Sequence, residues 1–193
     1  MMRLVCIFLI AVTAAMSPQG GQAEPAPAAD EFPLPVVEAA PDFNGVLARS
    51  AWIYIGGQPE RSALARMKAL GVETVINLRT GAEMSDRRQV PYDEQAEAES
   101  LGMRYVHVPA GGTKYPYSPA AVDQLAGAIA ATQGKVLLHC ASARRASHLW
   151  VAYLVKHQGF TLDEAIGHGR AVNFGELPLE GFLGQPVSFE LSE

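Results

Sequence analysis

The sequence predicts an α/β fold, a three-layer sandwich in which helices cover both faces of a mostly parallel central sheet. Short apolar or alternating strands follow one another from residue 52 onward, with helical patterns between them. Glycines at Gly71 and Gly102 end two of these helical patterns. A strand at residues 135–139 then runs through a short loop into an apolar-periodic helix. Strands that alternate with helices in this way are typical of parallel sheets.

The individual elements follow from local patterns along the chain. The sequence predicts strands at residues 52–55, 73–78, 103–108 and 135–139, and helices at residues 60–70, 92–101 and 118–132. A polar loop is expected at residues 79–86 and a long loop with glycines at residues 109–117. A capping box from Thr161 to Glu164 opens the last predicted helix. Such folds bind ligands beyond the carboxyl ends of their strands, so we expect a site there.

The first residues have the pattern of an export signal. A short basic start ends at Arg3, and the apolar run at residues 4–16 is too short to span a bilayer as a stable helix. Small residues lead up to Ala23, where a signal peptidase would cleave. We therefore expect residues 1–23 to be a signal peptide and the mature protein to be periplasmic or secreted, with no membrane attachment after cleavage.

The rest of the chain divides into two expected parts. Residues 24–41 are rich in Ala and Pro and are expected to form a disordered tether, because this composition buries too little apolar surface to order the chain. Residues 42–193 have the size of one domain. The net charge of the chain is −5 and no basic face is apparent, so nucleic acid is not expected as a partner.

A cysteine at the end of a predicted strand is the strongest chemical signal. Cys140 follows the strand at residues 135–139 and precedes a short loop that runs into a helix. The N–H groups and dipole at a helix start bind anions and favour the thiolate, the nucleophilic form of cysteine. Arg145 can donate two parallel hydrogen bonds to an oxyanion. A lone cysteine in such a place is often only a small core residue, but the two arginines that follow favour a reactive thiol.

Several motifs, taken in order, resemble one family. A His-Cys pair with four residues between Cys140 and Arg145 is similar to a shortened signature of the cysteine-dependent phosphatases, whose usual form is Cys-x5-Arg. The shorter spacing resembles a bacterial variant that includes the phosphatase-like domain of beta-lactamase-hydrolase-like proteins. The Gly-Gln-Pro turn at residues 57–59 and the strand Thr-Val-Ile-Asn-Leu-Arg at residues 74–79 resemble the same variant. The resemblance covers about residues 45–175.

The resemblance implies hydrolysis of phosphomonoesters through a phosphocysteine intermediate at Cys140. It assigns phosphate binding to the loop, which in this chain consists of Ala141, Ser142, Ala143, Arg144 and Arg145. It implies no cofactor and no metal, and its substrate would be a phosphorylated protein or small molecule. Ala143 stands where the family usually has glycine; if the loop needs a positive φ there, the alanine costs about 1 kcal/mol.

The general acid of the family is missing from its usual place. It is usually an Asp in the loop after the preceding strand, and here that loop, residues 109–117, holds no carboxylate. The leaving oxygen would then depart unprotonated or take a proton from water. Glu83 and Asp86, in the loop after the second strand, could substitute if that loop folds over the site. His107 could face the site from the third strand.

Two other functions remain open at this point. Four residues between Cys140 and Arg145 also resemble the active loop of rhodanese-like proteins, which transfer sulfur through a cysteine persulfide. The missing acid would also fit a pseudophosphatase that binds phosphate without hydrolysing its esters. The His-Cys pair and the strand at residues 74–79 favour the phosphatase hypothesis.

Overall fold

The computed structural model of the protein describes residues 31–177 and 179–188. At its centre lies a six-stranded sheet in the order β1-β2-β3-β6-β4-β5. Its strands are β1 (Val36–Glu38), β2 (Leu47–Ser50), β3 (Ile53–Gly56), β4 (Val72–Asn77), β5 (Arg104–His107) and β6 (Lys135–His139). The strands β3, β6, β4 and β5 run parallel, whereas β1 and β2 join the β3 edge in antiparallel pairs. The predicted sheet, parallel for the most part, is confirmed.

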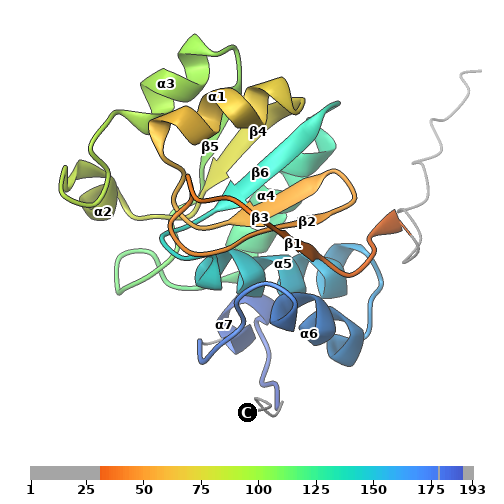
Figure 1. Ribbon diagram of the computed structural model, residues 1–193. Helices are drawn as coiled ribbons and strands as arrows, with labels where there is room; N and C mark the ends of the chain where they lie inside the picture. Colours follow the sequence, from red (N-terminus) through yellow and green to blue (C-terminus); the bar gives the residue numbers. More distant parts are fainter. Residues whose placement is uncertain (1–30, 178, 189–193) are drawn as a thin grey trace, which may run out of the picture.

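Helices cover both faces of this sheet (Figure 1). Along the described part of the chain they are α1 (Arg61–Ala69), α2 (Gly81–Ser85), α3 (Glu94–Ser100), α4 (Pro119–Ala130), α5 (Arg144–His157), α6 (Leu162–Arg170) and α7 (Leu179–Leu183). One face of the sheet carries α1 and α3, and the other carries α4 and α5, with α6 and α7 packed against α5. This arrangement confirms the predicted three-layer sandwich.

Side chains that alternate along the strands build a hydrophobic core on each face of the sheet. Ile53 and Ile55 of β3 join the core under α4 and α5, whereas Tyr54 between them joins the core under α1 and α3. Leu137 of β6 lies with Tyr54, and its two neighbours in the strand lie in the opposite core. Because both faces of these strands are buried, their sequences are nearly continuous apolar runs.

Two predicted features of the chain differ in the structure. The polar loop expected at residues 79–86 contains the short helix α2, because the Thr80 side chain and Glu83 form a capping box. The same device, at Thr161 and Glu164, opens α6 as predicted. That helix is not the last one, however, since α7 follows it in the described residues.

The folded body begins earlier than the expected boundary at residue 42. The range predicted as a disordered tether, residues 24–41, includes β1, which pairs with β2. Phe32 is buried and its ring lies edge-on to that of Trp150, with centroids 5.1 Å apart. The predicted signal peptide, residues 1–23, lies outside the described residues. Among the helices that are described, none has the length and apolar character needed to cross a membrane.

The carboxyl ends of the parallel strands form one aligned row. His139 of β6 pairs with Gly56 of β3 on one side and with Asn77 of β4 on the other, and Asn77 pairs with His107 of β5. The next residue of the chain after His139 is Cys140, so the cysteine leaves the sheet at its centre. α5 begins four residues later, at Arg144. The predicted strand, loop and helix around Cys140 are therefore confirmed.

The turn into α5 contains a strained residue. Ala143, at the N-cap of α5, has φ 69° and ψ −11°, which is the left-handed region. In that region the Cβ of any residue except glycine crowds its own backbone, at a cost of roughly 1 kcal/mol or more. Strain at this position was expected only if the loop needs a positive φ there, and Ala143 has such a φ.

Replacing Ala143 with glycine should therefore not destabilise the fold, although it removes a buried methyl group. We expect the free energy of unfolding in urea to stay the same or to rise by up to about 1 kcal/mol. The matched control is Ala146→Gly, which lies three residues later inside α5 and is also buried. That variant should lose about 1 kcal/mol. Equal losses in both variants would contradict the assignment of strain to Ala143.

Candidate active site

Cys140 lies at the bottom of a loop that joins β6 to α5. Its backbone N–H donates to the carbonyl oxygen of Gly56 (3.2 Å) and so continues the pairing of β6 with β3. Its side chain is buried, and it borders the larger hydrophobic core. This burial alone would suit a small core residue. The polar groups around the loop, however, are those of an anion-binding site.

The loop after Cys140 is held from outside through its carbonyl oxygens. The Ala141 oxygen accepts hydrogen bonds from the Asn44 side chain (3.0 Å) and from the Gln58 backbone (3.1 Å). The Ser142 oxygen accepts one from the Asn173 side chain (2.6 Å). Because these hydrogen bonds use carbonyl oxygens, they leave the N–H groups of the loop available to an anion. The loop therefore has the bracing that an anion-binding turn at a helix start requires.

The Gly-Gln-Pro turn contributes to this bracing through its glycine. A Cβ built on Gly57 would lie only 1.6 Å from the carbonyl oxygen of Asn44. Gly57 also forms an isolated antiparallel bridge with Ser142. Glycine is therefore required for the segment after β3 to fit between Asn44 and the Cys140 loop.

Arg145, in the first turn of α5, is anchored on one edge of its guanidinium. Nη1 and Nη2 donate to the two carboxylate oxygens of Glu83 at 3.0 and 2.6 Å, and Nη1 also donates to the Ala110 carbonyl oxygen (2.9 Å). Burial opposes the charge on Arg145, but the hydrogen bond to Glu83 and the nearby Cys140 raise its pKa. Within the described residues Nε has no hydrogen-bond partner. One edge of the planar donor set is thus fixed while the edge that includes Nε stays open.

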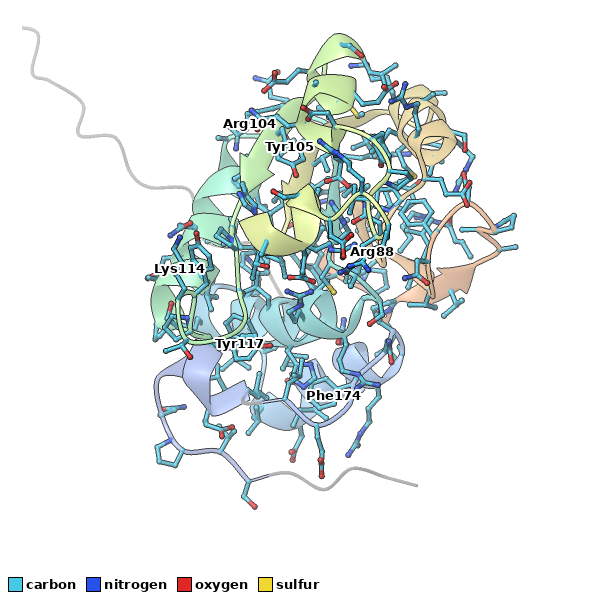
Figure 2. The ribbon with its side chains drawn as sticks, turned by 90° about the vertical axis from the view of Figure 1, so that its left-hand side faces the viewer. Arg88, Arg104, Tyr105, Lys114, Tyr117 and Phe174 are labelled. Carbon is cyan, nitrogen blue, oxygen red and sulfur yellow. The ribbon has the colours of Figure 1, made fainter. Side chains whose placement is uncertain are left out.

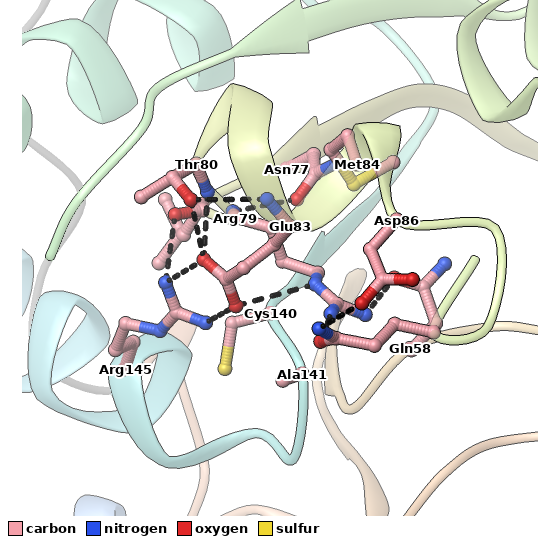
Figure 3. Close-up of polar contacts among 12 residues, drawn as sticks. Gln58, Asn77, Arg79, Thr80, Glu83, Met84, Asp86, Cys140, Ala141 and Arg145 are labelled. Atoms are coloured by element: carbon pink, nitrogen blue, oxygen red, sulfur yellow. Dashed lines mark hydrogen bonds and ion pairs between the residues drawn. The ribbon is translucent and has the colours of Figure 1, made fainter.

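Glu83 is the predicted acid candidate that the structure brings to Arg145 (Figure 3). It belongs to the capping box of α2, and its carboxylate accepts from both the backbone and the hydroxyl of Thr80. Burial would raise the pKa of Glu83, but Arg145 and Thr80 outweigh it and lower the pKa to about 2. Glu83 is therefore ionised at neutral pH and holds no proton to give in the resting site.

Asp86 and His107, the other two acid candidates, bind other partners than Arg145. Asp86 accepts hydrogen bonds from Arg88 and Gln89, and the Arg88 side chain is the main cause that lowers the pKa of Asp86 to about 2. His107 is exposed on β5, and its Nε2 donates to the carbonyl oxygen of Arg79 (2.6 Å). The structure records no contact of either residue with Cys140 or Arg145.

Arg144, the other arginine of the loop, faces away from this cluster. Its side chain is exposed and lies against the segment after α6, where a Cβ built on Gly175 would be 3.1 Å from its Nε. Its carbonyl oxygen accepts from the Ser147 hydroxyl and contacts the His148 ring. The structure therefore separates the two arginines, one toward Glu83 and one toward the C-terminal segment.

A buried carboxylate beneath the loop was missed by the sequence analysis. Glu94, at the start of α3, is 1% exposed. Its Oε1 accepts from His139 (3.0 Å), Asn77 (3.1 Å) and Tyr105 (3.0 Å), and its Oε2 accepts from Gln58. Burial would raise the pKa of Glu94, but His139 first, and then the other donors, hold it below the usual value. The carboxylate thus binds one residue each of β4, β5 and β6 and one residue just after β3.

A second missed residue, Arg79, connects this carboxylate to Arg145. Arg79 is 2% exposed, and its Nη1 donates to the Gln58 side-chain oxygen (2.9 Å). Its Nε lies 3.4 Å from the carboxylate of Glu83. A continuous path of polar contacts therefore runs from Glu94 through Gln58, Arg79 and Glu83 to Arg145.

Gln58 and Arg79 stand within the two motifs at residues 57–59 and 74–79, which could have indicated their importance.

A cavity of about 620 Å³ opens beside Arg145. The start of α2, from Thr80 to Glu83, forms one wall, and the loop from Gly111 to Tyr117 forms the other. This cavity leads from the anchored guanidinium to the surface, so a substrate could reach the site through it. Across the described residues, no three side chains of His, Cys, Asp or Glu come together as a metal site.

Two known proteins are similar to this chain in sequence. The Beta-lactamase hydrolase-like protein of Xylella fastidiosa is 35% identical over 124 residues, which make up 63% of this chain and 28% of that protein. Dual specificity protein phosphatase 26 of Rattus norvegicus is 33% identical over 145 residues, 72% of this chain and 64% of that protein. The chain therefore spans less than two thirds of the length of either relative.

A solved structure and a family model complete the comparison. P. aeruginosa TpbA in complex with pTyr has the same fold, with a TM-score of 0.52 and 21% identity over 70% of this chain and 77% of that chain. The family model described as "Beta-lactamase hydrolase-like protein, phosphatase-like domain" matches residues 51–155, more than half of the chain. This match includes Cys140, Arg145, Glu83 and Glu94. The chain belongs to this family of phosphatase-like domains, within the cysteine-based phosphatase superfamily.

Proposed function

We propose that the protein hydrolyses phosphomonoesters through a phosphocysteine intermediate at Cys140. The observation that carries the proposal is the state of Arg145, whose guanidinium is anchored by Glu83 on one edge and open at Nε. A phosphate group is best bound by such a planar pair of donors. Cys140 and the start of α5 lie next to this open edge, which supplies the nucleophile and further N–H donors.

The reaction would take place in two steps. The Cys140 thiolate attacks phosphorus, and the bond from phosphorus to the leaving oxygen breaks, which gives the phosphocysteine. Water then attacks the phosphocysteine, releases inorganic phosphate and restores the thiolate. In both steps the N–H groups of residues 141–145 and the Arg145 guanidinium would stabilise charge on the phosphoryl oxygens.

The cavity beside Arg145 favours an aryl phosphate or a phosphorylated tyrosine as substrate. Two tyrosines, Tyr115 and Tyr117, line it, together with three glycines, Gly81, Gly111 and Gly112. Aromatic side chains pack well against an aromatic ring, and glycines leave room for one. The pTyr bound to TpbA supports the same substrate class.

We further propose that the mature protein acts outside the cytoplasm. The support is the pattern of residues 1–23, which is typical of a cleaved signal peptide. Its substrate would then be a phosphorylated protein or small molecule in the periplasm or outside the cell. N-terminal sequencing of the protein from a periplasmic fraction tests this, and an intact Met1 on the fractionated protein would contradict it.

The first prediction concerns the nucleophile. Cys140→Ser should keep the fold and phosphate binding but lose nearly all hydrolysis of 4-nitrophenyl phosphate, by about a thousandfold or more, because a hydroxyl is far less acidic than a thiol. A thiosulfate-to-cyanide assay of the unaltered protein tests the persulfide alternative in parallel. Hydrolysis retained in the serine variant, or sulfur transfer without hydrolysis, would contradict the proposal.

The two loop arginines should respond differently to substitution. Arg145→Lys keeps the charge but loses the planar donor pair, so kcat/KM should fall about 100-fold or more. Arg144→Ala removes an exposed charge and should raise KM by less than about tenfold. Steady-state kinetics on both variants give the comparison. If the Arg144 variant loses more activity, the assignment of Arg145 to the phosphate is wrong.

Glu83 should act by positioning Arg145. Glu83→Gln removes the charge that anchors the guanidinium, so kcat/KM should fall about 10-fold to 100-fold. Asp86→Asn, in the same turn, is the matched control and should leave kcat/KM unchanged. If the Asp86 variant loses activity and the Glu83 variant keeps it, Asp86 is the residue at the site.

The Glu83→Gln variant also gives a test by the pH dependence of stability. The pKa of Glu83 is lowered from 4.5 to about 2, so its ionised form stabilises the fold above pH 4.5, and this stabilisation is lost as the pH falls toward 2. The free energy of unfolding of Glu83→Gln should therefore fall less steeply across this window than that of the unaltered protein. Parallel curves would show that the pair does not stabilise the fold.

A further inference from the structure

The loop that lacks the family's carboxylate ends in a tyrosine whose hydroxyl has no hydrogen-bond partner in the described part of the chain. Tyr117 is the last residue of the loop at residues 109–117, and it lines the cavity beside Arg145 and Glu83. Among the described residues the structure records no hydrogen bond to its hydroxyl. In the view of Figure 2, Tyr117 is seen between Lys114 of the same loop and Phe174 of the C-terminal segment. A half-buried hydroxyl without a protein partner is free to bind substrate.

The ring of Tyr117 is held in place by α7. Phe182 contacts it edge-on, with ring centroids 4.9 Å apart at 64°. Gly181 lies so close that a Cβ built on it would be 2.9 Å from the Tyr117 carbonyl oxygen and 3.0 Å from its Cβ. A proton donor has to be positioned in this way before substrate arrives, because its contribution depends on geometry.

The hydroxyl and the guanidinium of Arg145 face the same small space. A Cβ built on Gly111 would lie 3.8 Å from the Tyr117 hydroxyl and 3.4 Å from Arg145 Nη1. Burial is the main cause that raises the pKa of Tyr117, and the charges of Arg145, Cys140 and Glu83 are near enough to affect it. The hydroxyl therefore keeps its proton at neutral pH while it lies beside the residues of the proposed reaction.

We propose that the Tyr117 hydroxyl donates the proton to the leaving oxygen, in place of the missing carboxylic acid. This inference rests on the proposed phosphatase function. As Cys140 attacks phosphorus and the bond to the leaving oxygen breaks, the Tyr117 proton passes to that oxygen and leaves a tyrosinate. When water attacks the phosphocysteine, the tyrosinate takes a proton from that water. Each turnover thus converts one ester and one water into an alcohol and inorganic phosphate, and Tyr117 returns to its neutral form.

A tyrosine in this role should matter most for poor leaving groups. An aryl oxide with electron-withdrawing groups departs readily without a proton, whereas an alkoxide does not. Protonation by Tyr117 would therefore allow hydrolysis of alkyl phosphates that the sequence alone, with no acid in this loop, predicts to be poor substrates.

The test compares Tyr117→Phe with the unaltered protein on a series of leaving groups. The phenylalanine keeps the ring packed on Phe182 and removes only the hydroxyl. We expect kcat/KM for an alkyl phosphate such as β-glycerophosphate to fall about 100-fold, and that for 4-nitrophenyl phosphate to change less than about threefold. The dependence of rate on leaving-group pKa should become steeper over a series of substituted phenyl phosphates.

The matched control is Tyr153→Phe, which also removes one hydroxyl, that of a buried tyrosine on α5 that bonds Gln158 and lies outside this cavity. It should leave the leaving-group dependence unchanged. Inhibition by inorganic phosphate should be equal in all three proteins, which shows that the site is intact. An equal loss on every substrate, or no loss on the alkyl phosphate, would overturn the role of Tyr117. An unaltered protein without phosphatase activity or a phosphocysteine would instead overturn the proposed function itself.

Discussion

The site depends on one buried carboxylate, that of Glu94. The parallel strands end in a row, and residues in or just after each of them share one buried partner. Glu94 is this partner, because it accepts hydrogen bonds from Gln58 after β3, Asn77 of β4, Tyr105 of β5 and His139 of β6. A buried charge is stable only with such a full set of donors. The starting point of the Cys140 loop is thus set by a residue that never touches the cysteine.

The influence of this carboxylate reaches Arg145 through alternating charges. Glu94 binds Gln58, Gln58 binds Arg79, Arg79 lies against Glu83, and Glu83 anchors Arg145. Because each charged group is partnered by the opposite charge or a neutral amide, the path can be buried. It ends at an arginine edge with no partner in the described chain. In the proposed reaction this arrangement would hold donors in place for a phosphate dianion before it arrives, which is the basis of electrostatic catalysis.

The sequence predicted the parts of this molecule that depend on local pattern. The four parallel strands and the helix after Cys140 follow from periodicity and spacing, and the family resemblance is confirmed. Glu94 could not be predicted, because it lies 45 residues from His139 and its charge gave no sign of burial. The strand β1 could not be predicted from its Ala/Pro-rich range, because pairing with β2, and not its own composition, orders it. Glu83 was considered as an acid; only the structure shows the ion pair that keeps it ionised.

In the proposed reaction Cys140 carries the phosphoryl group during turnover. Rapid acid quenching of the unaltered protein during hydrolysis of an aryl phosphate, followed by peptide mass spectrometry, tests it most directly. The peptide that contains Cys140 should gain the mass of one phosphoryl group, and this gain should disappear once substrate is exhausted. Turnover with an unmodified Cys140 peptide, or with the mass of an added sulfur on it, would show that the reaction does not pass through a phosphocysteine.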